Sequence, residues 1–139
     1  MGTKFNFKSQ ICTDKIQSER LLALGLKKET ADMWYPHFAK TYPIPLVNEV
    51  LTTDDTPAWS LGRLLEMLPN PIPISENLPT FNHYAFLNLS AESVVYCWED
   101  YDGADRALVG FTGNGFFAAV VDATEWLIKE GCFNKKYLI

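Results

Sequence analysis

Apolar residues recur at helical intervals in the first half of the chain, most regularly around residue 65. Four leucines within residues 61–68 fall at positions i, i+3, i+4 and i+7, which gives a helix one apolar face. We expect Thr56 to cap this helix and Pro57 to occupy its first turn, where a proline removes no hydrogen bond. Pro69 ends it, because proline has no amide to continue the helical ladder.

Two shorter helices are predicted before this one. Thr13 and Asp14 supply a cap and an acidic first turn for a helix that Gly25 ends. A second, short helix covers residues 28–33 and ends at the proline that follows. Residues 42–55 contain two prolines, so we interpret them as an extended connector.

After residue 80 the apolar positions alternate, as they do in β-strands. Asp102-Gly103 is typical of a two-residue type I′ turn, which needs a positive φ at both positions. A turn there pairs residues whose numbers sum to 205 and sets Glu99 directly opposite Arg106. Residues 84–89 supply a third antiparallel strand. The same register gives the hairpin one apolar face, made of Val94, Tyr96 and Trp98 opposite Phe111, Val109 and Ala107.

The last predicted element is a helix from residue 114 or 115 to Glu130, with Gly131 just past its end. Its apolar stripe matches the apolar hairpin face, so we expect the two to pack together. The opposite sheet face carries Val95, Cys97 and Leu108, which suggests that it is partly covered too. We expect one core to bury Leu61, Leu64, Leu65, Leu68, Trp98, Phe117, Val121 and Leu127.

These elements predict an α+β fold, with a three-stranded antiparallel meander, a C-terminal helix packed on it and N-terminal helices completing the core. We expect a single domain over residues 1–139, because 139 residues that are 47% hydrophobic can bury one sizeable core. Within it, residues 1–69 form a helical half, residues 70–79 a proline-rich link, and residues 80–139 the meander with its helix.

The charges are distributed unevenly along the chain. Between Lys40 and Lys129 there is no lysine, and the two arginines, Arg63 and Arg106, stand against twelve carboxylates in residues 49–125. That stretch therefore has a formal charge of minus ten. Because such a surface is repelled by phosphate backbones, we expect no nucleic-acid partner.

The cysteine and hydropathy patterns predict the redox state of the thiols and the cellular location of the protein. Cys12, Cys97 and Cys132 are odd in number and widely separated, which predicts reduced thiols rather than a disulfide framework or a zinc site. The longest apolar run, residues 116–121, is too short to span a membrane, and residues 1–10 lack a signal-peptide pattern. We expect a cytoplasmic protein with no membrane contact, no cofactor and no metal.

Three segments carry a resemblance that spans most of the chain. They are QSERLLALGLKKETADMW at residues 17–34, TPAWSLGRLLEMLP at residues 56–69 and ATEWLIKEGCFNKKYL at residues 123–138. In this order they resemble an uncharacterised family of small proteins encoded by prophages and mobile elements of gut bacteria. The resemblance implies a bacterial, cytosolic, accessory gene product. It carries no known active site, so no functional residue is transferred.

No motif in the chain names a reaction. His37 and His83 stand at helical spacing neither from each other nor from a cysteine, so any catalytic or metal-binding pair has to be assembled by the fold. Asp100 and Asp105 face each other in the proposed hairpin register. Their spacing departs from that of an EF-hand loop, and we expect a solvated turn that binds no divalent cation tightly.

Trp59 and Arg63 are the candidate binding residues. On a helix that starts at Thr56, Trp59 projects about 160° away from the leucine face and lies near Arg63. An exposed tryptophan beside an arginine is typical of a protein-interaction hot spot. The alternative is a Trp59 covered by the proline-rich segments or by the second sheet face.

The leading functional hypothesis is a small soluble, non-enzymatic module that binds another protein. The alternative is a small enzyme or ligand-binding domain whose site forms only in three dimensions, around His37 or His83. A third hypothesis is an acidic decoy that occupies the basic surface of a nucleic-acid-binding protein. Twelve acids spread over residues 49–125 are sparse beside the phosphates of DNA, which weakens this third hypothesis.

Overall fold

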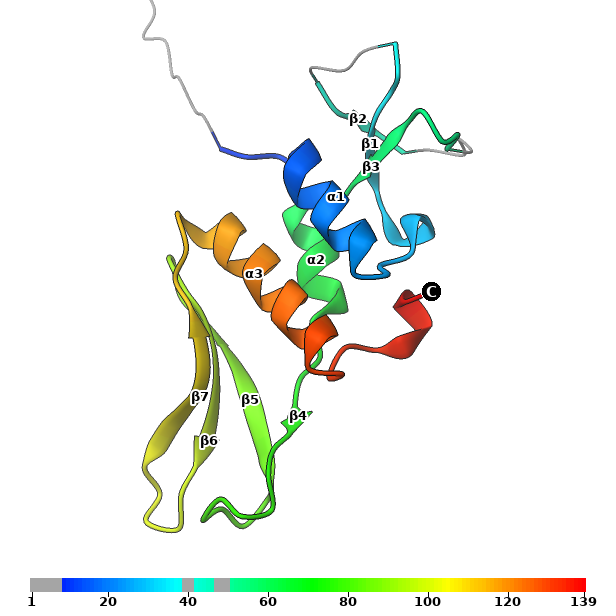
Figure 1. Ribbon diagram of the computed structural model, residues 1–139. Coiled ribbons are helices and arrows are strands. Elements are labelled where there is room, and N and C mark those ends of the chain that lie inside the picture. Colours follow the sequence, from blue (N-terminus) through cyan, green and yellow to red (C-terminus); the bar gives the residue numbers. More distant parts are fainter. Residues whose placement is uncertain (1–8, 39–41, 47–50) are drawn as a thin grey trace, which may run out of the picture.

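The computed structural model describes residues 9–38, 42–46 and 51–139. Three α-helices occupy the centre of the molecule, with a small sheet at one end and a larger, curved sheet at the other (Figure 1). The α+β fold class is confirmed. The elements are α1 (Lys15–Ala23), η1 (Lys28–Thr30), β1 (Met33–Tyr35), β2 (Ile44–Pro45), β3 (Thr56–Ala58), α2 (Leu61–Met67), β4 (Ile72–Pro73), β5 (Tyr84–Leu89), β6 (Val94–Glu99), β7 (Asp105–Phe111), α3 (Phe116–Lys129) and η2 (Lys135–Tyr137).

Helix α1 begins one residue later than a Thr13 cap would place it. The side chain of Asp14 accepts from the amide of Gln17, and the Gln17 side chain accepts from the amide of Asp14, which completes a capping box. Thr13 instead binds the hydroxyl of Ser18 at 2.7 Å. Gly25 follows the helix with a φ of 98°, a left-handed conformation that favours glycine, so the predicted C-terminus is confirmed.

The small sheet replaces two predicted helical segments. Only the first three residues of 28–33 are helical, and Met33–Tyr35 form the central strand of the order β2-β1-β3. The predicted start of the leucine helix at Thr56 is wrong, since Thr56–Ala58 pair with β1 as an edge strand, where a proline is tolerated. Helix α2 starts after Ser60, whose hydroxyl accepts from the amide of Arg63.

The larger sheet has the order β4-β5-β6-β7, all antiparallel. The third strand over residues 84–89 is confirmed, and β4 adds a fourth from within the predicted proline-rich link. Helix α3 packs across β6 and β7, as expected, and α2 packs on the other side of α3 (Figure 1). The predicted bounds of the C-terminal helix, residue 114 or 115 to Glu130, are confirmed to within a residue or two by α3.

The hairpin register is partly correct. Val94, Val95 and Tyr96 pair with residues whose numbers bring each sum to 205, but a β-bulge follows and the remaining pairs sum to 204. Leu108 is the additional residue on β7. Consequently Arg106 stands opposite Trp98 and Glu99 opposite Asp105, so the predicted Glu99–Arg106 pair is wrong.

The slip originates in the turn. Asp100 accepts from the backbone amides of Asp102 and Ala104 and pairs with Ala104 through the backbone, which leaves a three-residue loop. Only Gly103 in this loop has a positive φ, 82°, whereas a type I′ turn requires two such residues. The predicted two-residue turn and the facing Asp100–Asp105 pair are therefore wrong.

One core joins the helices to the larger sheet. Of the eight residues expected in it, Leu64, Leu68, Val121 and Leu127 are buried. The other four are partly buried and pack against the same cluster, namely Leu61, Leu65, Trp98 and Phe117. The core prediction is thus largely confirmed.

Candidate functional site

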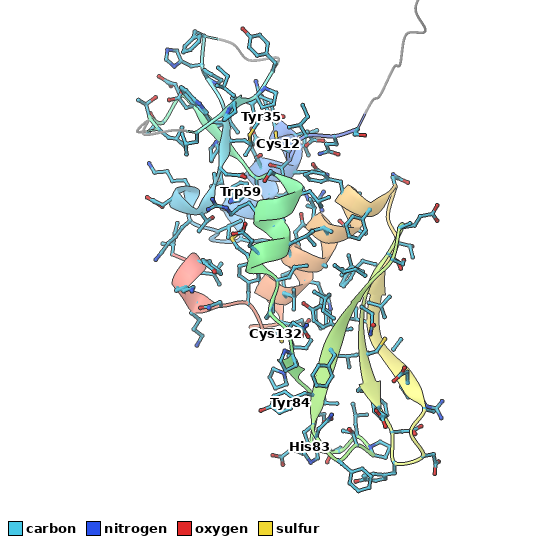
Figure 2. All side chains as sticks on the ribbon, turned by 180° about the vertical axis from the view of Figure 1, so that it is seen from behind. Cys12, Tyr35, Trp59, His83, Tyr84 and Cys132 are labelled. Atoms are coloured by element: carbon cyan, nitrogen blue, oxygen red, sulfur yellow. The ribbon has the colours of Figure 1, made fainter. Side chains whose placement is uncertain are left out.

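Trp59 does not form an exposed hot spot. Trp59 lies at the N-terminal end of α2 (Figure 2). Its side chain is fully buried, and its indole Nε1 donates to Oγ1 of Thr30 at 2.8 Å. Its backbone amide donates to Oγ1 of Thr13 at 3.0 Å. Arg63 Nη1 donates to the carbonyl of Thr30 at 3.1 Å. Both candidate binding residues therefore hold Thr30 close to the start of α2, and Trp59 is part of the buried core.

His37 is brought next to a carboxylate, Asp55, at 3.0 Å between Nδ1 and Oδ1. Asp55 also accepts from the backbone amides of His37 and Thr52 and from the Thr52 hydroxyl. These donors, the Thr52 amide first and the His37 ring next, hold the pKa of Asp55 well below its usual range. Because its carboxylate oxygens already accept these hydrogen bonds, Asp55 stabilises the loop before β3 by linking it to His37.

The other polar candidates also have structural partners. His83 is exposed, has a φ of 57°, and its carbonyl accepts from the amide of Ile74. At the hairpin turn, Nε of Arg106 lies 2.9 Å from Oδ2 of Asp100. The amide of Ala104, followed by Arg106, lowers the pKa of Asp100. Within residues 9–38, 42–46 and 51–139, no group of three or more His, Cys, Asp or Glu side chains is placed to hold a metal ion.

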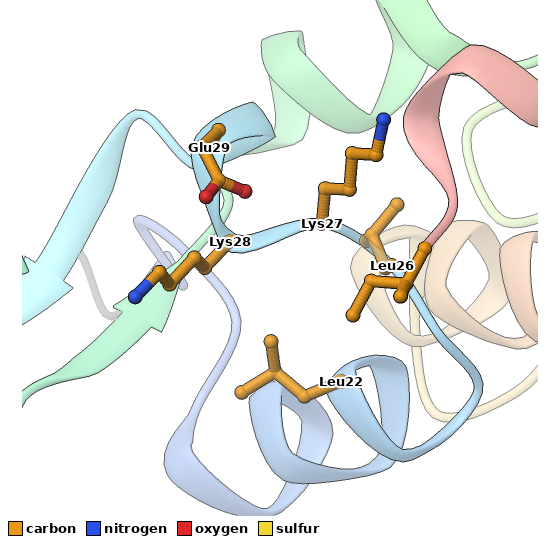
Figure 3. Close-up of a pocket in the computed structure, with 6 residues that line it drawn as sticks. Leu22, Leu26, Lys27, Lys28 and Glu29 are labelled. Carbon is orange, nitrogen blue, oxygen red and sulfur yellow. The ribbon is translucent and has the colours of Figure 1, made fainter. Parts of the chain in front are cut away.

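A hollow of about 540 Å³ lies between α1 and the C-terminal segment (Figure 3). Its walls are mostly apolar, and its polar lining comes from Lys27, Lys28 and Glu29. Nζ of Lys27 is already used, since it donates to the carbonyl of Lys136 at 3.1 Å. Neither histidine contributes to this hollow, so it brings no acid–base pair together.

The larger sheet has one face against α3 and one face without a helix among the described residues (Figure 1). We call the second one the outer face. Successive side chains of a strand point to opposite faces, and Ala85 and Tyr96 are buried toward α3. The outer face therefore carries Tyr84, Phe86 and Asn88 of β5, Val95 and Cys97 of β6, and Ala107 and Gly110 of β7, with Leu108 at the bulge beside it.

Aromatic side chains dominate this face. Tyr84 and Phe86 are 46% and 44% exposed, although they sit in the middle of a sheet. At the hairpin end, Phe81 packs against Tyr101 with ring centroids 4.4 Å apart and the rings inclined by 60°, and both residues are largely exposed. The expectation that Val95 and Cys97 are partly covered is confirmed, whereas Leu108 is exposed. Such a cluster of exposed aromatic and aliphatic side chains is typical of a binding surface.

The same part of the chain carries the net charge. Residues 70–115 contain six carboxylates and one cation, Arg106, which gives minus five. The remaining residues contain eleven carboxylates and eleven cations, so the whole chain also has a charge of minus five. Because Arg106 is paired with Asp100, the larger sheet and its loops present an acidic surface.

The chain matches no family model, no curated protein and no solved structure. None of the helices in the described part of the chain has the length and apolar character needed to cross a bilayer.

Proposed function

We propose that this chain is a protein-interaction module that binds its partner through the outer face of the larger sheet. The observation that carries the proposal is that Tyr84 and Phe86 are about half exposed on β5, a strand whose opposite face places Ala85 in the core. Following the resemblance in its sequence, we further propose that it is an accessory product of a bacterial mobile element and acts in the cytoplasm.

Two properties of the outer face favour a protein partner. Aromatic side chains lose little conformational entropy on binding and supply large contact areas, which is why they recur at the centres of interfaces. Tyr84 is held here by its pairing with Pro73 of β4 and Phe86 by its pairing with Cys97 of β6, so the backbone of this surface is already ordered before binding. The surrounding carboxylates then select among partners by charge.

A small enzyme or ligand-binding domain is the second candidate, and the His37–Asp55 pair favours it. Imidazole oriented by a carboxylate is a common general base. Asp55, however, is already bound by Thr52, and His37 packs edge-on against Phe38 at 5.5 Å between ring centroids. The outer face gives the interaction module the stronger support.

The proposal is tested by placing a photo-crosslinking amino acid on the protein and identifying what it captures in cells of the source organism. The crosslinker replaces Leu108, beside the outer face. Three baits are compared: the parent, Phe86→Ser and the matched control Ile16→Ser. Ile16 serves as the control because it is 69% exposed on α1, away from the larger sheet. We expect one protein to be captured by the parent and by Ile16→Ser, and not by Phe86→Ser. Equal capture by all three baits would refute the outer face as the binding surface.

A further inference from the structure

The two edges of the larger sheet are built differently. Edge strand β4 has two residues, Ile72 and Pro73, and Pro71 precedes it. Short length and proline are devices that keep a sheet edge from pairing with another chain. Edge strand β7 has seven residues with neither proline nor lysine, and five of the seven are exposed. One edge is therefore protected and the other is open.

The open edge offers backbone groups for a further strand. Alternate amides and carbonyls of an edge strand point away from its neighbour, and among the described residues no segment pairs with the free side of β7. The bulge at Leu108 interrupts the strand. The regular part of β7 that follows it is residues 109–111, which pair with Tyr96, Val95 and Val94. A bound strand therefore has about three residues in register there.

The side chains of β7 leave room on the outer face. Gly110 lies on that face opposite Val95, and a β-carbon built on it would meet Cγ2 of Val95 at an ordinary 3.5 Å. The position therefore holds a small hollow next to the open edge. An apolar side chain from an added strand, diagonal to Val95, fills it and continues the face formed by Phe86 and Val95.

We propose that the partner of the outer face is an extended segment in which basic residues alternate with apolar ones, and that it adds as a strand along β7. This inference rests on the proposed function and specifies the partner. Its basic character follows from the charge of minus five on residues 70–115, whose one cation is already paired with Asp100. The exposed carboxylates of Glu99 and Asp105 lie where β7 begins, on the far side of the bulge from residues 109–111, so a lysine or arginine meets them where the bound segment continues past the bulge.

A second copy of the chain is the competing occupant of the same edge. Pairing β7 with β7 would bring two surfaces of charge minus five together, and like charges across an interface disfavour that complex. The bulge at Leu108 further shortens the run that two identical edges share. Both features favour a basic partner over self-association.

The probe for this proposal is a fluorescein-labelled eight-residue peptide of alternating lysine and valine. Binding to the whole chain is measured by fluorescence anisotropy, and amide hydrogen exchange of residues 108–111 is followed in the same complex. Two control peptides are used, one with N-methyl groups on alternate amides and one with glutamate in place of lysine. We expect only the unmodified lysine peptide to bind and to slow exchange of the β7 amides.

The charge requirement is tested on the protein. The double variant Glu99→Gln with Asp105→Asn should weaken peptide binding by about two- to fivefold for each charge removed, and raising the salt should do the same to the parent. Both side chains are exposed, so the variant retains its fold.

Three results overturn the inference. One is equal binding of the N-methylated peptide, which shows that no strand is added. The second is peptide binding without slower exchange at residues 108–111. The third is slower exchange there as the protein's own concentration rises, which identifies a second copy as the occupant. If the crosslinking result with Phe86→Ser holds while any of these occurs, the interaction module stands and only strand addition is refuted.

Discussion

Replacing Trp59 with alanine tests whether this residue is part of the core or part of a surface. Trp59 is fully buried, with 0% of its surface accessible to solvent, and its indole donates a hydrogen bond to Thr30. Truncating a buried aromatic side chain costs about 3 to 5 kcal/mol, through lost burial and the cavity left behind. A folded chain of 139 residues has a stability of roughly 7 to 20 kcal/mol, so the variant still folds.

The magnitude is measured by urea unfolding and by thermal melting. For a chain of this length, roughly 4 °C of melting temperature corresponds to each kcal/mol, so we expect a decrease of about 12 to 20 °C. Phe81→Ala is the matched control, because Phe81 is also aromatic and is 81% exposed. Its free energy of unfolding should change by less than about 0.5 kcal/mol.

A double-mutant cycle separates the hydrogen bond from the volume of the ring. Trp59→Phe keeps most of the ring and removes the donor, and Thr30→Val removes the acceptor at nearly constant volume. We expect a coupling energy of about 1 kcal/mol between the two positions. Unchanged melting of Trp59→Ala would mean that Trp59 is exposed and would restore it as a binding candidate.

Three further predictions follow from the sheet and its loops. Gly110→Ala should stabilise the fold by about 0.5 to 1 kcal/mol, and Gly103→Ala should destabilise it by about 1 to 2 kcal/mol, because only the second has a left-handed φ; urea unfolding checks both. The pKa values of Asp55 and Asp100 are lowered, so the stability that the two carboxylates contribute is present above their unfolded pKa of about 4 and is lost as the pH falls below that value. Replacing either residue with Asn should lower the free energy of unfolding at pH 7 and make it fall less steeply in acid, which urea unfolding at several pH values measures. Calcium should leave the melting temperature unchanged, because the Asp100 carboxylate is already engaged at the hairpin turn, whereas a rise at sub-millimolar metal would reveal a site there.

The sequence predicts the elements whose pattern is local. Strand β5 follows from a short apolar run and helix α3 from a long apolar stripe. The first half of the hairpin register follows because a slip would turn every side chain to the other face. The turn is different, since two turn types compete at Asp102-Gly103. The side chain of Asp100 decides between them by binding the amides of Asp102 and Ala104.

Where the local sequence pattern gave the wrong element, contacts between residues far apart in the chain determine the structure. Thr56 and Pro57 resemble a helix start, but β1 offers them a partner strand, and Asp32 and Ser60 together cap α2 four residues later. Trp59 then lies before the helix, so its angular position on a helical wheel has no meaning. The candidate site was misplaced because the start of one helix was.

The outer face also has a signal in the sequence, although a weak one. A sheet with one covered face normally alternates apolar residues inward with polar residues outward. Strand β5 departs from this in its first four residues, because Tyr84 and Phe86 alternate with Ala85 and Leu87, so apolar side chains stand on both faces before Asn88. The chain provides α3 for one face and, in the described residues, no helix for the other. Apolar residues on an uncovered face lower solubility without adding to the core. Such a departure from the usual inward–outward alternation is expected where a binding function requires it.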